Sequence, residues 1–462
     1  MKKNLLTVAL GCCFLACHIS AENLNISAKQ EEQKIDYSER PQIVLSGSAA
    51  VHNSFTKPKV KTYQGDSNGL FKTTKKPDMD STMARLVSGE ADIEFKAIGR
   101  LQNGVEYGAY FDLYAMKGDT GMDKVYLQFT RTGWGTLQIG NLKGPEAKML
   151  CSGQQLLGGT CGIDGTVEHD IDQVEGCIRP LYVIGNSSKA TKIVYYTPRV
   201  YGLQFGVALT PDTKHIGHND KTWRAGDSSA GNDLGLFRKG SDDKQRPSGR
   251  TNVALGLSHA HDFKNGFATK VAAVYVFEDT RPILLHNYTY ASGSDTGATS
   301  EEKKVTLRNA RSYHLTASVK YNCITLAAGY LNNGHSRLPI KKTYDDFTPC
   351  QFMSDKNANA GKSWNVGAKY EVNENLAFAF CYNHATRKIT STEKAQNHIY
   401  TLTVDYKICD GLMLFAEFDY ENAKSTPTAC MQRNKITTKS SEREAIKRQK
   451  CGLIALGAKV SF

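Results

Sequence analysis

The sequence predicts an all-β protein, an antiparallel β-barrel of 16 strands that crosses an outer membrane. Sixteen short stretches alternate between apolar and polar residues, and their connections are alternately tight turns and long loops. The last of these stretches, LIALGAKVSF, runs to the end of the chain. Lipid offers no hydrogen-bond partner to an unpaired backbone amide, so strands cross a bilayer only when their sheet closes on itself.

The N-terminus predicts a cleaved signal peptide over residues 1–21. Two lysines precede an apolar run from Leu5 to Ala16, and small and polar residues follow up to Ala21. This order is typical of a secretory signal, so we expect the mature chain to begin near Glu22. An imperfect lipobox, FLAC, leaves lipid attachment at Cys17 as an alternative. Residues 22–41 are polar and predict a periplasmic extension, which leaves 42–462 for the transmembrane barrel.

Composition agrees with a barrel and argues against helical spans. The chain has 462 residues, of which 40% are hydrophobic and 23% charged, and by length alone it could form two or three soluble domains. Beyond the signal, no apolar run reaches the roughly 20 residues that a spanning helix needs. The 40 Gly, 22 Tyr and 18 Phe suit strands that carry aromatic rings at the two lipid–water boundaries.

The turns between the alternating stretches set the order of the strands. QNG, at 102–104, and KNG, at 264–266, are hairpin turns, and Gly133 and the pair Pro198 and Arg199 mark two more. Short turns lie in the periplasm and long loops outside, so both termini are expected in the periplasm. We expect strands over 42–53, 89–101, 105–116, 124–132, 134–141, 192–197, 201–210, 251–262, 267–277, 311–321, 323–332, 363–372, 375–384, 398–406, 412–421 and 451–462.

Within each strand, the alternation of residue types separates an apolar face from a polar face. In the second strand, Ile93 and Phe95 point one way, while Glu94 and Lys96 point the other. A soluble β-sandwich is the alternative, but it would need a second sheet over each apolar face. A barrel of about 16 strands leaves an aqueous channel when its interior is polar. The pattern therefore predicts passage of small hydrophilic solutes and ions down their gradients.

Three stretches resemble the 16-stranded general diffusion porins of Gram-negative bacteria. DKVYLQFTRTGWGTLQIGNLKGPEA, 123–147, is similar to the fourth and fifth strands of these porins at the entry to their constriction loop. KIVYYTPRVYGLQFGVALTPD, 192–212, is similar to the hairpin that follows. GLIALGAKVSF, 452–462, matches the terminal strand that the barrel-assembly machinery recognises, through the alternating residues Ile454, Leu456, Ala458, Val460 and Phe462.

The resemblance implies a long third loop, here 142–188, that folds into the lumen and narrows it. In relatives, acidic residues of this loop face basic residues of the wall across a transverse field. The acidic candidates in this loop are Glu146, Asp164, Glu168, Asp170, Asp172 and Glu175. The basic candidates are Arg85, just before the second strand, and Lys96 and Arg100 within it. Each of these charges could instead be an ordinary hydrated group.

The resemblance also implies a homotrimer, with contacts around the first and last strands and a second loop that reaches over the neighbour. The segment KGDTGM, 117–122, is a short version of that latch. Other expected partners are outer-membrane lipid and lipopolysaccharide, the barrel-assembly machinery, and small solutes and ions, with no nucleic acid. The net charge of +12 could serve lipopolysaccharide phosphates or anions, or be hydrated in the loops, and it leaves ion selectivity undetermined.

Cysteine is abundant for such a chain. Of twelve cysteines, Cys12, Cys13 and Cys17 belong to the signal, and the remaining nine cannot all pair within one chain. Oxidation after export makes disulfides plausible in the loops. The candidates are Cys151, Cys161 and Cys177 in the third loop, and Cys430 and Cys451, which bracket the last external loop, with pairing left open.

Motifs for catalysis are missing from the sequence. It contains no GxSxG elbow, P-loop, dinucleotide fingerprint or CxxC spacing, so we expect no enzyme activity, cofactor or metal. His259 and His261 share one face of a strand, and their place near the periplasmic boundary favours interfacial histidines over a metal pair or a lipolytic site. The alternatives are a barrel-wall hydrolase and a substrate-specific channel or adhesin.

Overall fold

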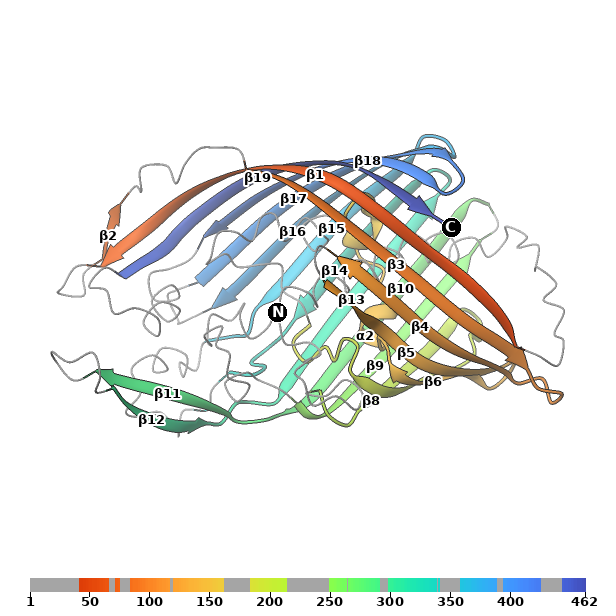
Figure 1. Ribbon diagram of the computed structural model, residues 1–462, viewed down its shortest axis with the longest axis horizontal. Coiled ribbons are helices and arrows are strands. Elements are labelled where there is room, and N and C mark those ends of the chain that lie inside the picture. Colours follow the sequence, from red (N-terminus) through yellow and green to blue (C-terminus); the bar gives the residue numbers. More distant parts are fainter. Residues whose placement is uncertain are drawn as a thin grey trace.

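The structure is a closed antiparallel β-barrel (Figure 1). It is a computed structural model, which describes residues 41–65, 71–74, 84–116, 119–161, 183–213, 249–263, 265–290, 298–338, 340, 358–388, 394–424 and 443–462. The expected signal peptide and residues 22–40 of the expected extension lie outside these residues. No helix in the described part of the chain is long and apolar enough to cross a membrane.

Sixteen strands pair in sequence order around the ring, and the last pairs with the first. β2 (Phe71–Thr74) only extends the sheet beside the end of β1. The sixteen wall strands are β1 (Gln42–Gly65), β3 (Ala84–Arg100), β4 (Glu106–Met116), β5 (Asp119–Arg131), β6 (Gly135–Asn141), β7 (Thr191–Tyr196), β8 (Leu203–Thr210), β9 (Gly249–Asp262), β10 (Phe267–Thr280), β13 (Ala310–Tyr321), β14 (Ile324–Asn332), β15 (Lys362–Glu371), β16 (Leu376–Lys388), β17 (Lys394–Cys409), β18 (Leu412–Lys424) and β19 (Arg443–Ser461).

All sixteen predicted strands are confirmed, but several are longer than expected. β1 has 24 residues, although about 9–11 are enough to cross a bilayer. Its second half, TKPKVKTYQG, lacks the regular alternation of apolar and polar residues on which the prediction depended. For the same reason the sequence did not predict the hairpin of β11 (Ile283–Tyr290) and β12 (Ala298–Val305), which projects from one end of the barrel (Figure 1).

The outward face of the barrel is apolar and the inward face is small or polar. Leu127, Leu326 and Leu402 are each 44–55% exposed on the outside, as side chains bathed in lipid must be. Alternate residues of the same strands are buried inward, and many of them are Ala, Ser, Thr or charged. The apolar and polar faces expected from the alternation are therefore the outward and inward faces of the barrel wall.

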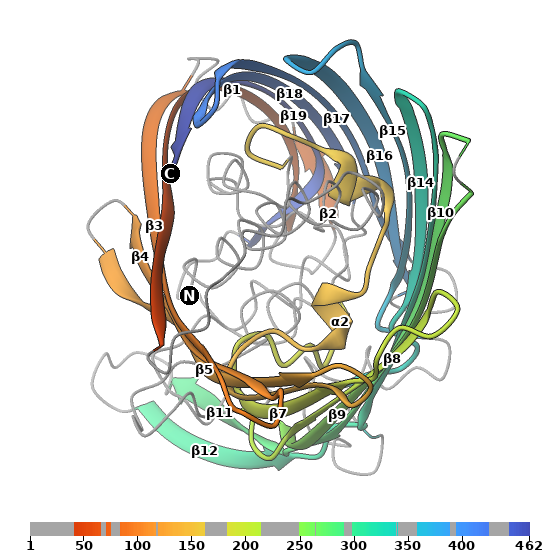
Figure 2. The ribbon, with the colours of Figure 1, turned by 90° about the vertical axis from the view of Figure 1, so that its right-hand side faces the viewer.

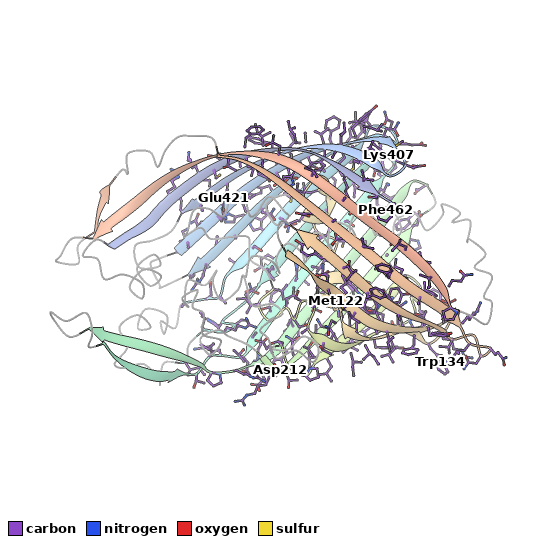
Figure 3. The ribbon with its side chains drawn as sticks, viewed as in Figure 1. Met122, Trp134, Asp212, Lys407, Glu421 and Phe462 are labelled. Atoms are coloured by element: carbon purple, nitrogen blue, oxygen red, sulfur yellow. The ribbon has the colours of Figure 1, made fainter. Side chains whose placement is uncertain are left out.

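The ring closes between β1 and β19. Gly47 and Phe462 exchange two backbone hydrogen bonds, of 2.9 and 3.0 Å, which carry the pairing to the last residue. Phe462 lies at the end of the barrel that holds the short turns (Figure 3). Ile454, Leu456 and Val460 of the expected assembly signal are 48–52% exposed on the outward face, and Ala458 shares their alternation. Their recognition by the assembly machinery stays a prediction.

We expect the closing seam to tolerate no side chain at Gly47. A Cβ atom there would lie 2.6 Å from the Asp92 carbonyl oxygen and 2.8 Å from the Phe462 ring, whereas at Gly452, also in the seam, nothing lies within 4 Å. Gly47→Ala should therefore destabilise the barrel by about 1–3 kcal/mol, and Gly452→Ala should not. Gel mobility against temperature measures both, and equal melting of the two variants would contradict this account of closure.

Candidate functional site

The third loop enters the barrel and follows its inner wall (Figure 2). After β6 it forms a short helix, α2 (Pro145–Lys148), and a 3₁₀ turn, η1 (Gly153–Leu156). α2 packs against β8, β9 and β10, and η1 packs against β14, β15 and β16. The described part of the loop therefore lies along one side of the lumen.

Glycines in the wall make room for the first leg of the loop. A Cβ atom at Gly256 would lie 2.5 Å from the Met149 sulfur and 2.8 Å from Cβ of Pro145, and one at Gly206 would lie 2.9 Å from the same sulfur. Leu142 and Met149 join a buried cluster with inward residues of β7 to β10, including Val194. This side of the barrel is filled by a packed apolar core rather than by water.

Backbone amides beyond this core donate to side chains of the wall. The Cys151 amide donates to Oγ1 of Thr316 on β13 at 3.0 Å. The Gly153 amide donates to Oδ1 of Asn365 on β15 at 2.9 Å. A Cβ atom at Gly153 would lie 2.4 Å from the Gly367 amide nitrogen, so only glycine fits this approach. The wall thus supplies acceptors that the loop's own backbone does not provide.

The tip of the described first leg is bound to β17 and β18. The Gly158 amide donates to Oγ1 of Thr403 at 3.1 Å, and the Gly159 amide donates to Oδ1 of Asp405 at 2.8 Å. The Thr160 amide donates to Glu417 at 2.8 Å, and the Thr160 hydroxyl donates to the same carboxylate at 2.9 Å. The anchors of the first leg therefore continue around the inner wall from β13 to β18.

The returning leg is held in the same way. The Ile184 amide donates to Oδ1 of Asn333 at 2.9 Å, and Oγ of Ser312 donates to the Ile184 carbonyl at 2.9 Å. Asn252 on β9 donates to the Gly185 carbonyl. Both described legs therefore end on polar side chains that point inward from the wall.

Glu146 has a different place from the one expected of a lumen acid. Its carboxylate lies 3.6 Å from Nζ of Lys192, and both side chains are fully buried. Oγ of Ser187 donates to the same carboxylate at 3.2 Å, and Lys192 also donates to Oγ of Ser187 and to the Ser188 carbonyl. The two legs of the loop are tied together here, because a buried charge must be paired. Glu146 is therefore a structural residue of the loop base and does not face the water of the lumen.

Acidic and basic groups share the wall opposite the anchored loop. On β3 and β4, Glu94 pairs with Lys96 at 2.8 Å, and Asp112 pairs with Lys124 of β5 at 2.6 Å. Asp123 pairs with Lys189 of the returning leg. The expected basic wall is therefore mixed in sign.

Of the other predicted charges, Arg100 is exposed at the end of β3, and Arg85 lies in β3 with its side chain outside the described residues. The remaining loop acids, Asp164, Glu168, Asp170, Asp172 and Glu175, lie outside the described residues.

A family model described as Gram-negative porin matches residues 43–426. The chain belongs to the Gram-negative porin family. It is an outer-membrane porin, a water-filled channel through which small hydrophilic solutes and ions diffuse passively. The family match runs from β1 to β18, includes the third loop, and ends before β19.

Relatives and solved structures agree with this assignment. Two uncharacterised proteins, of Rickettsia felis and Rickettsia prowazekii, are each 23% identical to this porin over 65% of its chain and 70% of their own. OmpT, an outer membrane protein of Vibrio cholerae solved in a trimer form, is 9% identical with a TM-score of 0.52, over 92% of this chain and all of that one. Its loop L8 deletion mutant has a TM-score of 0.51 at 10% identity. At such identities the structures show a shared fold.

The prediction that Cys151 and Cys451 of this porin form disulfides is wrong. Cys151 and Cys451 are buried, reduced thiols. Cys151 lies 3.3 Å from the Thr316 hydroxyl, and Cys451 points inward from β19, so each fills a packed site rather than bridging loops. Cys161 is disulfide-bonded, and none of the other described cysteines is its partner. Cys177 and Cys430 lie outside the described residues.

The two histidines on β9 lie on the wall of the porin, near the short turn between β9 and β10. The rings of His259 and His261 are 6.3 Å apart, and His261 packs edge-on against Phe263 at 4.4 Å. The described residues hold no group of three His, Cys, Asp or Glu that could bind a metal ion.

Sequence reasoning missed the residues that anchor the loop. In the sequence, only the alternation within the strands identifies Thr403, Asp405 and Glu417, as polar residues on the inward face. Their hydrogen bonds join residues about 250 positions apart in the chain, such as 159 and 405. The one local signal was the glycine pair Gly158 and Gly159, because glycine permits a close approach of backbone to a wall.

Lys148 is a loop charge that responds to pH near neutrality, as does Lys189 of the returning leg, whose pKa burial also lowers to about 7. Burial lowers the pKa of Lys148 to about 7, and the positive charges of Lys124, Lys192 and Lys143 lower it further, while Glu146 raises it. Its Nζ donates to Oε1 of Gln138 on β6 at 2.9 Å. Lys148 is therefore cationic below about pH 7 and neutral above it.

The first prediction from the site concerns the tip anchor. Glu417→Ala removes the acceptor of both the amide and the hydroxyl of Thr160, and each such hydrogen bond stabilises by about 0.5–1.5 kcal/mol. We expect greater current noise and more frequent transitions in single-channel records. The matched control is Glu374→Ala in the exposed β15–β16 turn, which removes the same charge and should leave the trace unchanged. Wild-type noise in Glu417→Ala would show that the loop needs no anchor there.

The second prediction concerns pH. As pH rises from 6 to 8, Lys148 loses its positive charge, so the reversal potential in a KCl gradient should move toward cation selectivity. The shift should be smaller in Lys148→Met, which has no charge to lose at that position. A shift of the same size in both would assign the titration to other groups.

Proposed function

We propose that the channel is a passive, non-enzymatic pore whose narrowest part lies between the third loop and the wall formed by β3, β4 and β5. The hydrogen-bonded attachment of the loop inside the barrel is the observation that carries the proposal. A segment tied at Thr316, Asn365, Asp405 and Glu417 takes up lumen cross-section permanently. Solutes must then pass beside the mixed charges opposite.

The mixture of charges supports weak rather than strong ion selectivity. Lys96 and Lys124 face acids of the same wall, so much of their field is cancelled within a few ångströms. A transverse field of the expected kind would rest on the acids of 164–175, and reversing Asp170 and Asp172 to Lys is the direct check of their part. Unchanged reversal potentials would remove them from the constriction.

A homotrimer is part of the proposal. The trimer form of the Vibrio cholerae protein supports it, and so does the outer wall near the seam, where Phe95 and Phe111 stack at 4.6 Å. Most of the segment expected as a latch belongs to the wall, because β5 begins at Asp119. The subunits would therefore meet through barrel walls, with little help from the second loop.

The proposal also includes export of the chain across the inner membrane and its assembly in the outer membrane. The signal peptide would be removed near Glu22, and the terminal strand would be read by the assembly machinery. N-terminal sequencing of the mature protein distinguishes cleavage there from lipid attachment at Cys17.

Planar-bilayer recording of the purified porin tests the function. We expect conductance steps in groups of three, nearly linear in salt concentration, that fall as neutral sugars of increasing size enter and block the pore. Phospholipid incubated with the same sample should remain intact. Saturable conductance with one sugar would indicate a substrate-specific channel, and absence of conductance from a folded barrel would overturn the proposal.

A further inference from the structure

A groove of about 860 Å³ lies at the external end of the wall, where β9, β10 and β13 end and the β11–β12 hairpin begins. Its sides are formed by the ends of these strands and by the segments 306–309 and 334–336, with Ile340. Three arginines line it, Arg250, Arg308 and Arg311, together with His335 and a single acid, Asp279. The groove is therefore cationic.

The groove opens on the lipid side of the barrel rather than into the lumen. Along β13, Arg311, Tyr313 and Leu315 alternate on the outward face, and the last two are 38% and 47% exposed. Arg311 is thus one outward position closer to the external rim than Tyr313. Because tyrosine rings mark the level where lipid head groups begin, the arginines lie at head-group height.

The guanidinium groups of these three arginines have N–H donors available for a ligand. Within the described part of the chain, none of the three arginines forms a salt bridge or a side-chain hydrogen bond. The Arg311 guanidinium lies 5.9 Å from the centre of the Phe277 ring, a cation–π contact that uses none of its N–H donors. Three cations face one aspartate, an imbalance that an anionic ligand would relieve.

The backbone that carries the arginines is rigid. The Arg308 amide donates to the Leu338 carbonyl at 2.8 Å, and the Arg311 amide donates to Oγ of Ser336 at 2.8 Å. Beneath them, the buried Arg337 forms two hydrogen bonds with Glu278, of 2.9 and 2.8 Å. The side chains of the groove therefore start from fixed positions, which lowers the entropic cost of binding.

We propose that this groove binds the phosphate head group of a lipid of the outer leaflet. Planar guanidinium groups bind phosphate through paired N–H donors, and arginine suits this geometry better than lysine. A lipid is favoured over a soluble phosphate because Phe277, paired with Arg311, and Tyr313 occupy outward positions of β10 and β13, next to the apolar wall where acyl chains would lie. The inference rests on the proposed function and on the orientation expected from the sequence, with long loops outside.

Native mass spectrometry of the purified porin, titrated with diphosphoryl lipid A, tests the site. Arg308→Ser with Arg311→Ser should weaken lipid A binding at least about tenfold, because two charge-assisted contacts are lost. The matched control is Lys388→Ser with Lys424→Ser, which removes two exposed cations from the same rim outside the groove and should change binding less than about twofold. Phosphatidylcholine should bind no better to the wild type than to either variant.

Each other result counts against the inference. Equal lipid A binding by the two double variants would overturn the site, and so would displacement of lipid A by millimolar inorganic phosphate, which would make the groove a site for soluble anions. Wild-type channel conductance in both double variants shows that the barrel and proposed pore are intact, so failure of this site is distinct from failure of the proposed function. If the arginine pair fails to fold, Arg250→Ser takes its place, with Lys388→Ser as control.

Discussion

Satisfaction of backbone hydrogen bonds is the constraint on which this structure depends. In lipid it forces the sixteen strands into a ring, and the pairing of Gly47 with Phe462 carries the ring to its last residue. The same demand operates inside the barrel, because the third loop has little secondary structure of its own. Its amides at 151, 153 and 158–160 take their acceptors from inward side chains of the wall, so the loop and the barrel hold one another in place.

This arrangement shapes the pore from one side. The first leg of the loop begins in an apolar core with β7 to β10 and ends on carboxylates of β17 and β18, so the described loop occupies this half of the inner wall. In the proposed pore, water and solutes pass beside the wall of β3, β4 and β5, where lysines lie next to acids. Geometry would then set which solutes pass, while the charges of that wall and Lys148 of the loop, which responds to pH, would modulate the passage.

Much of the fold could be predicted from the sequence, because alternation is a local signal wherever one face meets lipid. All sixteen strands were recognised for that reason, and β2, β11, β12 and the far half of β1 were missed because their sequences lack a regular alternation of apolar and polar residues. The site was less accessible. Glu146 has the composition of a lumen acid, and only its contact with Lys192 shows that it is buried. From the sequence of an exported chain, Cys151 and Cys451 were likewise expected to form disulfides. In the structure, Cys151 packs against Thr316 and Cys451 is buried within β19, and both are free thiols. Contacts between residues far apart in the chain decide these roles, and no single-sequence pattern records them.

Amide hydrogen exchange of the folded porin in detergent tests the attachment of the loop most directly. The account predicts that the amides of Gly153, Gly158, Gly159 and Thr160 exchange slowly, on the timescale of the strands β13 to β18 that hold them. Exchange as fast as that of the exposed turn at 102–103 would mean that the loop moves freely in the lumen, and would contradict the account.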